Sequence, residues 1–581
     1  MYRGMNKLVK TGLAGTSAMV LAVTALVTSP SAYAAGSSSI NSQPVSKLKQ
    51  GGTLTLPILY PPINYNISHP DGNDADVSGM MGMTLPSLIY FDSNGKLQLD
   101  KNYVTAFEQT KASPQTLRIA LNPKAIWSDG KKISLADFVG HWKALNGTNA
   151  AYQVVSKQGY EDISSVKKGA NTNEIIVTFK KPYPDWQALF SGLMPTSLTK
   201  DAETFNNAWK TKPAIGSGPF IFESANADQT TVVWVKNPKW WGSKPILDKV
   251  IYRAIGPDAQ YAALANNEIQ YMDLATDANS LKRARSNSKL QVHDVPGVGT
   301  WEHIDINSKN PILADVDVRR AITVALNRQV YAEANTGLFV KNPVVKNNRT
   351  FYDGQACNVD ASGKWGKRNT ALADELLDKA GWTVATSSSE KDSNGDAKVV
   401  GFRYYSGPAK AGLVANQKMT IKFTYPTNYP NRANVATLTQ AMLRAAPIGI
   451  DLQLREVPRS DYFSKYVDVD KLDFELVTFA WTGSSFPISG SMNIVDKTSE
   501  QNYAKDSITP QMQSLILQAA GELNPVKRCA LANSVEKALW DNAYNIPLYM
   551  WPGTSATAKT LANYGSFGPS SIDWTKVGFV K

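Results

Sequence analysis

IWSDGKKISLADFVGHWKAL, residues 126–145, combines a turn and a helix start in a pattern that constrains the fold. Asp129-Gly130 is a turn dipeptide. Ser134 can cap a helix, and Asp137 three residues later completes a capping-box pattern. The apolar residues that follow share one helical face: Leu135, Phe138, Val139, Trp142 and Leu145. The residues alone therefore predict a strand end, a tight turn and a capped amphipathic helix.

Further segments of the chain carry equally distinctive strings. They are GSGPF (216–220), NPKWWGSKP (237–245) followed by LDKV (247–250), DVRRAITVALNR (317–328), LLDKAGW (376–382) and IPLY (546–549). Taken in order with residues 126–145, these strings resemble landmarks of the family 5 extracytoplasmic solute-binding proteins. Such proteins are the peptide-, nickel- and glycoside-binding subunits of ABC importers. The resemblance spans nearly all of the chain after its N-terminal segment.

The resemblance implies an α/β fold of the periplasmic-binding-protein type II class, with two lobes joined by a two-strand hinge. Lobe I would comprise residues 51–68, 213–302 and 548–581, with residues 69–212 inserted as a subdomain. Lobe II would comprise residues 303–547. From residue 419 onward, strands alternate with helices, which independently favours a sheet with a largely parallel core.

The N-terminus is typical of an export signal. Arg3, Lys7 and Lys10 precede an apolar run, and Ala32-Tyr33-Ala34 fits a cleavage site, so residues 1–34 are interpreted as a signal peptide. An uncleaved membrane anchor is the alternative. No cysteine follows Ala34, so we expect no lipid anchor at that point. Residues 35–50 are predicted to be a flexible leader. We expect a location in the periplasm or on the outer face of the cytoplasmic membrane.

Composition and motifs argue against several classes of function. The net charge is +12, but the Lys and Arg residues are scattered, so we predict no nucleic-acid partner. No GxSxG or GxxxxGK motif occurs, and the four histidines stand singly without metal-ligand spacing. We therefore expect no enzyme activity, no metal and no cofactor. A carboxylate-pair glycosidase has no motif to test, so an exported hydrolase remains the alternative class.

Cys357 and Cys529 are the two cysteines of the chain. In an oxidising compartment an isolated pair is consistent with a disulfide. Two buried free thiols are the alternative, because their separation in sequence neither supports nor excludes contact.

The resemblance also places candidate ligand-binding residues at the cleft between the lobes. They are Tyr60, Asn64, Tyr65, Trp301, His303, Trp481, Thr482, Gly483, Ser484, Ser485, Phe486, Tyr549 and Trp551. Aromatic walls and hydrogen-bonding backbone edges suit a binding cleft. Core packing is the competing interpretation for each aromatic residue in this set.

One departure from the family pattern bears on the ligand. Peptide binders of the family carry an Asp that takes the ligand's ammonium group, whereas Ser484 and Ser485 stand at that place here. We expect a monomer that captures oligopeptides and delivers them to an ABC permease and its ATPase subunits. A non-peptide solute, such as an oligosaccharide, a metal chelate or haem, is the alternative. A signalling receptor for a peptide is a further alternative to uptake.

Overall fold

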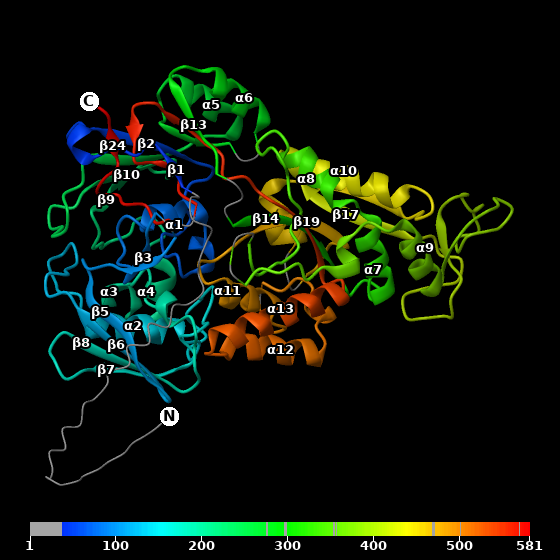
Figure 1. Ribbon diagram of the computed structural model, residues 1–581, viewed down its shortest axis with the longest axis horizontal. Helices are drawn as coiled ribbons and strands as arrows, with labels where there is room; N and C mark the ends of the chain where they lie inside the picture. Colours follow the sequence, from blue (N-terminus) through cyan, green and yellow to red (C-terminus); the bar gives the residue numbers. More distant parts are fainter. Residues whose placement is uncertain are drawn as a thin grey trace, which may run out of the picture.

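A computed structural model shows an α/β protein with two lobes side by side (Figure 1). It describes residues 38–581 except residues 94, 275–276, 296–298, 353–354, 356, 468–470, 500 and 569. The predicted signal peptide therefore lies outside the described residues. Among the described helices, none combines the length and the apolar character needed to cross a bilayer.

The first lobe is built on two sheets. One has the order β2 (Thr53–Ile58), β11 (Lys249–Ala254), β10 (Thr231–Lys236) and β9 (Phe220–Ala225). The other has the order β12 (Tyr271–Asp273), β21 (Ser555–Ala558) and β13 (Leu290–His293). Helices α5 (Pro257–Ala265) and α6 (Ala278–Ser286) pack beside this second sheet. Strands far apart in sequence thus share one lobe.

An antiparallel sheet forms the inserted subdomain. Its order is β5 (Val104–Ala112), β6 (Gln115–Leu121), β8 (Glu174–Phe179) and β7 (Ile163–Lys168). Helix α2 (Leu135–Leu145) lies beside it and begins where the sequence predicts. The Asp137 carboxylate accepts a hydrogen bond from the Ser134 N–H at 2.9 Å, which is the expected capping-box contact. This subdomain shares one hydrophobic cluster with the first lobe.

Shorter elements fill the rest of the first lobe and its insert. They are α1 (Ala75–Met81), β3 (Ile89–Phe91), β4 (Leu97–Leu99), α3 (Thr196–Thr199) and α4 (Ala202–Asn207). The Asp137 carboxylate also accepts hydrogen bonds from the Thr196 N–H and hydroxyl, which ties the start of α2 to α3.

The second lobe is built on a five-stranded sheet. Its order is β18 (Asp451–Val457), β17 (Thr420–Pro426), β19 (Leu476–Thr482), β14 (Thr300–Ile306) and β20 (Asn545–Met550). The predicted parallel core holds for β18, β17 and β19 only, because β14 runs antiparallel to both of its neighbours.

Seven helices of the second lobe matter for the site or for the sequence predictions. They are α7 (Val316–Ala325), α8 (Arg328–Thr336), α9 (Thr370–Lys379), α10 (Pro430–Arg444), α11 (Pro487–Val495), α12 (Pro510–Gly521) and α13 (Pro525–Asp541). Residues 316–330 show the periodicity of one helix. The structure has two, because Leu326 and Asn327 adopt extended backbone between α7 and α8.

The chain crosses between the lobes just before β14 and just after β20. The two crossings run side by side, since the Trp551 N–H donates to the Thr300 carbonyl at 2.8 Å and the Gly553 N–H to the Val295 carbonyl at 2.9 Å. Both β14 and β20 belong wholly to the second lobe's sheet. The expected boundaries at 302 and 548 fall within these two strands.

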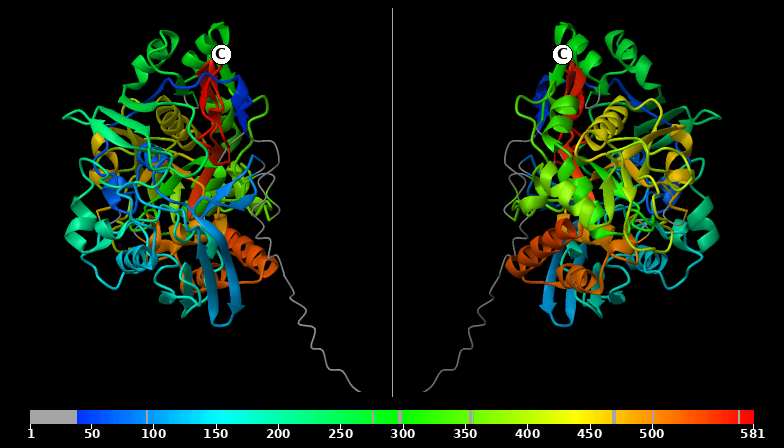
Figure 2. Two further views of the ribbon diagram at one scale, coloured as in Figure 1. Left: turned by 90° about the vertical axis from the view of Figure 1, so that its left-hand side faces the viewer. Right: turned by 90° about the vertical axis from the view of Figure 1, so that its right-hand side faces the viewer.

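The predicted flexible leader is wrong for residues 38–50. Strand β1 (Ser39–Ile40) pairs with β23 (Gly565–Ser566), and Leu48 forms an isolated bridge with Val580. Leu48 is buried against Ile246 and Ala562. In Figure 2 the blue N-terminal segment lies beside the red C-terminal strands. Composition suggested flexibility, but pairing with the distant C-terminal tail fixes the segment.

Candidate functional site

Aromatic side chains line one face of the paired strands β14 and β19. Trp301 lies directly opposite Trp481, and His303 lies opposite Phe479. The His303 ring is stacked on Trp481 at 6.1 Å between ring centroids and contacts Phe479 at 4.4 Å. His303 is fully buried, so it is a packing residue in this conformation, whereas Trp481 is only partly buried.

A cavity of about 50 Å³ opens beside this aromatic face. It lies between the ends of β14 and β19, the segment 349–352, the helix α11 and the residues before β20. Its lining includes Trp301, Arg349, Thr350, Tyr352, Trp481, Thr482, Gly483, Ser484, Ile494, Val495, Tyr544 and Asn545. The structure thus brings five predicted residues to one cavity: Trp301, Trp481, Thr482, Gly483 and Ser484.

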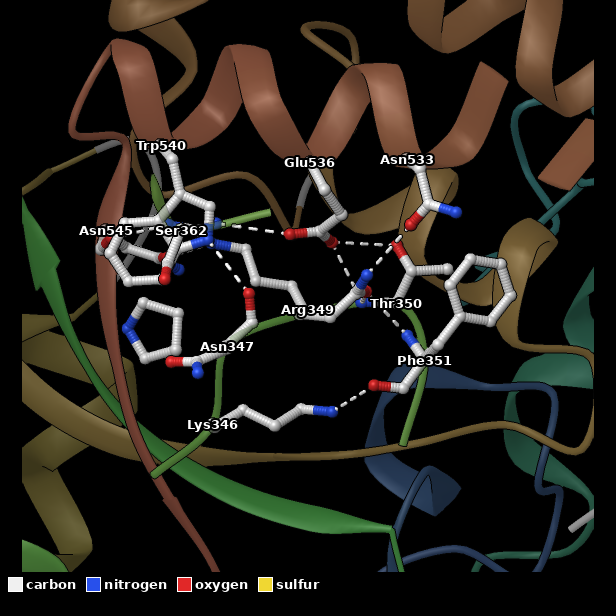
Figure 3. Close-up of polar contacts among 12 residues, drawn as sticks. Lys346, Asn347, Arg349, Thr350, Phe351, Ser362, Asn533, Glu536, Trp540 and Asn545 are labelled. Atoms are coloured by element: carbon white, nitrogen blue, oxygen red, sulfur yellow. Dashed lines mark hydrogen bonds and ion pairs between the residues drawn. The ribbon is translucent and has the colours of Figure 1, made fainter. Parts of the chain in front are cut away.

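A buried polar network forms the floor of the cavity (Figure 3). Arg349 donates to the Asn545 side chain at 2.6 Å and to Glu536 at 3.2 Å. The other Glu536 oxygen accepts from the Thr350 N–H and hydroxyl at 2.8 and 2.9 Å. Burial lowers the pKa of Arg349, and the adjacent Glu536 charge opposes that shift. The charges of this network are therefore paired with each other.

Gly483 is required by the packing of the cavity wall. Its N–H donates to the Gly299 carbonyl at 2.5 Å, and the Tyr352 hydroxyl donates to the same carbonyl at 2.9 Å. A Cβ atom on Gly483 would overlap the Tyr352 hydroxyl. The loop after β19 therefore approaches the Tyr352 ring closely because residue 483 has no side chain.

The loop after β19 carries hydroxyl groups where the family pattern has an acid. Ser484 accepts a hydrogen bond from the Phe486 N–H at 3.0 Å, which shapes the turn into α11. Asp496, the next acid along the chain, lies beyond the far end of α11 and accepts hydrogen bonds from Thr498 and Gln513. Neither Ser485 nor Asp496 lines the cavity.

Three predicted residues at the end of β2 lie away from the cavity. Asn64 is buried, and its side-chain amide donates a hydrogen bond to the Asn206 carbonyl. Tyr65 is also buried and packs edge-on against Trp234. Both are core residues here, so the prediction that they bind ligand is not supported by their placement. Tyr60 is 54% exposed, and its ring faces the Arg459 guanidinium of the second lobe at 5.1 Å. Only Tyr60 of the three lies at the boundary of the lobes.

Tyr549 and Trp551 lie on the opposite side of the sheet from the cavity. Tyr549 pairs with Glu302 across β20 and β14, and it is buried. The Trp551 indole N–H donates to Glu302 at 3.0 Å, and Thr478 donates to the other Glu302 oxygen at 2.8 Å. Arg432 of α10 lies 3.4 Å from the same carboxylate. Glu302 therefore joins the two crossings in a buried network that the sequence did not predict.

Phe486 contacts the first lobe. It packs against Phe91 at 6.2 Å and belongs to the hydrophobic cluster of the first lobe and its insert. On the same side, Arg528 of α13 forms a buried two-pronged ion pair with Asp185, at 2.6 and 2.8 Å. Gln158 of the insert donates to the Ser489 carbonyl of α11 at 2.9 Å. The two lobes thus touch next to the cavity.

The structure joins Cys357 and Cys529 by a disulfide, with their Cα atoms 5.7 Å apart. The Asn533 side-chain amide donates to the Cys357 carbonyl at 2.9 Å, one turn further along α13. The bond ties the chain that follows the cavity floor to the helix that carries Arg528. The structure thereby places the bridge next to the contact between the lobes.

The sequence missed several lining residues because they lie in segments without a motif. Arg349, Thr350 and Tyr352 come from an irregular segment, and Tyr544 and Asn545 precede the second crossing. The one available signal was the position of Tyr544-Asn545 directly before IPLY (546–549). Within the described part of the chain, no three His, Cys, Asp or Glu side chains gather as a metal-binding group.

The sequence pattern that defines a protein family, bacterial extracellular solute-binding proteins, family 5 Middle, matches residues 101–503 of this chain. The chain belongs to this family. The oligopeptide-binding protein OppA of Mycobacterium tuberculosis is 33% identical over 548 residues, which cover 94% of this chain and 87% of OppA. The family is one of extracellular binding proteins, in agreement with the resemblance read from the motifs.

Solved structures agree on the fold. The periplasmic EDTA-binding protein EppA superposes with a TM-score of 0.81 at 23% identity, covering 93% of this chain and 98% of EppA. The oligopeptide-binding protein AppA from Bacillus subtilis, in complex with a nonapeptide, has a TM-score of 0.74 at 19% identity and covers 92% and 100%. At such identities these likenesses establish the two-lobed family fold and leave the ligand open.

Proposed function

We propose that this family 5 solute-binding protein captures oligopeptides outside the cytoplasm and delivers them to an ABC permease and its ATPase subunits. The observation that carries the proposal is the relationship to OppA, which is named as an oligopeptide-binding protein and aligns along 94% of this chain. In this proposal the protein acts as a monomer, holds no cofactor and performs no catalysis.

The arrangement of the lobes is suited to this task. Two adjacent crossings form a hinge, and contacts between the lobes lie beside an aromatic-walled cavity. A ligand that touches both lobes stabilises the closed form, as in other hinged binding proteins. The start of β14 and the end of β19 border the cavity, so a solute held between the lobes can reach it.

Native mass spectrometry of the protein purified from its own cell envelope tests the proposal. The expected result is a ladder of short peptides released from the protein and identified by fragmentation. A single non-peptide mass would overturn the peptide assignment. In that case the absence of an acid at Ser484 and Ser485 would be the structural reason.

A further inference from the structure

The walls of the cavity are mainly apolar. Four aromatic rings contribute to them, from Trp301, Tyr352, Trp481 and Tyr544, together with the aliphatic side chains of Ile494 and Val495. A water molecule needs roughly 10–15 Å³ of such space, so a cavity of about 50 Å³ holds a group of about four heavy atoms. That is the size of a branched aliphatic side chain.

Most polar side chains in the lining already have partners in the protein. Tyr352 donates to the Gly299 carbonyl, and Tyr544 donates to the Asn502 side chain at 2.8 Å. Thr350 donates to Glu536. A polar group entering the cavity would give up its hydrogen bonds to water and find few free partners in return. The lining therefore disfavours polar groups.

The one charged residue in the lining cannot attract an anion strongly. Arg349 is buried, and its guanidinium donates hydrogen bonds to the Glu536 carboxylate and to the side chain and carbonyl of Asn545 (Figure 3). Its charge is therefore compensated before any ligand arrives. Because this pair is neutral overall, neither a carboxylate nor an ammonium group in the cavity would find a free opposite charge to offset its lost hydration.

The cavity is reachable from the boundary between the lobes. Thr482 is exposed at its rim, Trp481 is partly exposed, and the loop that follows leads to Phe486 in contact with the first lobe. A ligand whose backbone lies along the ends of β14 and β19 can thus direct one side group into the cavity.

We propose that this cavity is a subsite for one compact, uncharged, branched aliphatic group of the bound solute. This inference rests on the proposed function and deepens it: the peptides that bind best carry Val, Leu or Ile at one fixed position. The subsite excludes Lys, Arg, Asp and Glu at that position, while other positions tolerate them.

Isothermal titration calorimetry with alanine-based pentapeptides tests the inference. Each position in turn carries Leu, Lys or Glu, and the unsubstituted peptide serves as the reference. At one position we expect Leu to bind about 10- to 100-fold more tightly than Lys or Glu, because burial of one aliphatic side chain provides that factor. Equal affinities at every position would overturn the subsite and leave the proposed function intact. No binding by any peptide would overturn both.

Two substitutions at Ile494 locate the preference. Ile494→Phe fills the cavity, so the ratio of the affinity of the Leu peptide to that of the unsubstituted peptide should fall toward one. Ile494→Ala enlarges the cavity and should shift the preference from Leu toward Phe. Leu517→Phe, at an exposed position of α12, is the matched control and should change neither affinity. Retention of the full Leu preference in both Ile494 variants would show that the subsite lies elsewhere.

Discussion

Two buried histidines differ in whether their ring nitrogens make hydrogen bonds. His141, in the inserted subdomain, is 1% exposed. Its Nδ1 accepts from the Met194 N–H at 3.2 Å, so Nε2 carries the proton and donates to the Tyr160 hydroxyl at 2.9 Å. Every polar atom of this ring is satisfied, as expected of a residue that stabilises a core.

His303, beside the cavity, is fully buried between aromatic rings instead. Neither of its ring nitrogens has a hydrogen-bond partner among the described residues. Nε2 lies 3.3 Å from an Asp305 oxygen, within ion-pair range but without hydrogen-bond alignment. The ring of His141 is thus fully hydrogen-bonded, whereas the ring of His303, next to the candidate site, is not.

The ion pair between Arg528 and Asp185 joins the second lobe to the inserted subdomain. It therefore forms when the lobes close and breaks when they open. Arg528→Ala leaves Asp185 buried without its partner when the lobes close, which costs the closed form about 2–5 kcal/mol. We expect weaker ligand binding and a larger radius of gyration in small-angle scattering with ligand present. Lys527→Ala, at the exposed neighbouring position, is the control. Unchanged affinity in the Arg528 variant would show that the pair does not contribute to closure.

Removal of the paired histidine should cost the next largest amount. His141→Phe leaves the Met194 N–H without a partner and removes a donor from Tyr160, which together destabilise by about 2–4 kcal/mol. Urea unfolding at pH 7.5, followed by circular dichroism, measures the change. A loss below about 1 kcal/mol, the net worth of a single hydrogen bond, would mean that solvent or repacking replaces both contacts.

The pH dependence of stability should also report on His141. Burial lowers the pKa of His141 to about 3, below its value of about 6.5 in an unfolded chain. Between these values the unfolded state binds the extra proton, so stability falls as the pH falls. The loss from pH 7.5 to 5.0 should be about 2 kcal/mol in the native protein. The His141→Phe variant should lack this contribution, and an equal pH slope in both proteins would contradict the assignment.

The unpaired histidine should tolerate replacement best. His303→Phe keeps an aromatic ring between Trp301 and Phe479 and removes nitrogens that make no hydrogen bond among the described residues. Unfolding free energy should therefore change by less than about 1.5 kcal/mol. A loss above about 3 kcal/mol would show that the contact with Asp305 is a true buried ion pair.

Local pattern predicted much of the fold. The capping residues Ser134 and Asp137 start α2 as expected. The helical pattern over 316–330 does not report the break at Leu326 and Asn327 that separates α7 from α8, because periodicity is insensitive to the backbone conformation of two residues. Motif order identified the family, and the family brought the two-lobed fold with it.

The candidate site was only half predictable. Trp301 and Trp481 could be named because the family resemblance places these positions at the cleft between the lobes. Arg349 and Tyr544 could not, because their role depends on contacts with residues almost two hundred positions away. Asn64 and Tyr65 come from a string near the predicted cleft, and the structure places both in the core, away from the cavity.

The sequence by itself determined the local elements, the family and the absence of an acid at Ser484 and Ser485. These properties reside in neighbouring residues, where capping, periodicity and spacing act over a few positions. Tertiary structure decided which side chains face the cavity, which polar groups are already paired, and that residues 38–50 are fixed by the C-terminal tail. Those outcomes depend on burial and on partners brought from distant segments, which no local pattern encodes.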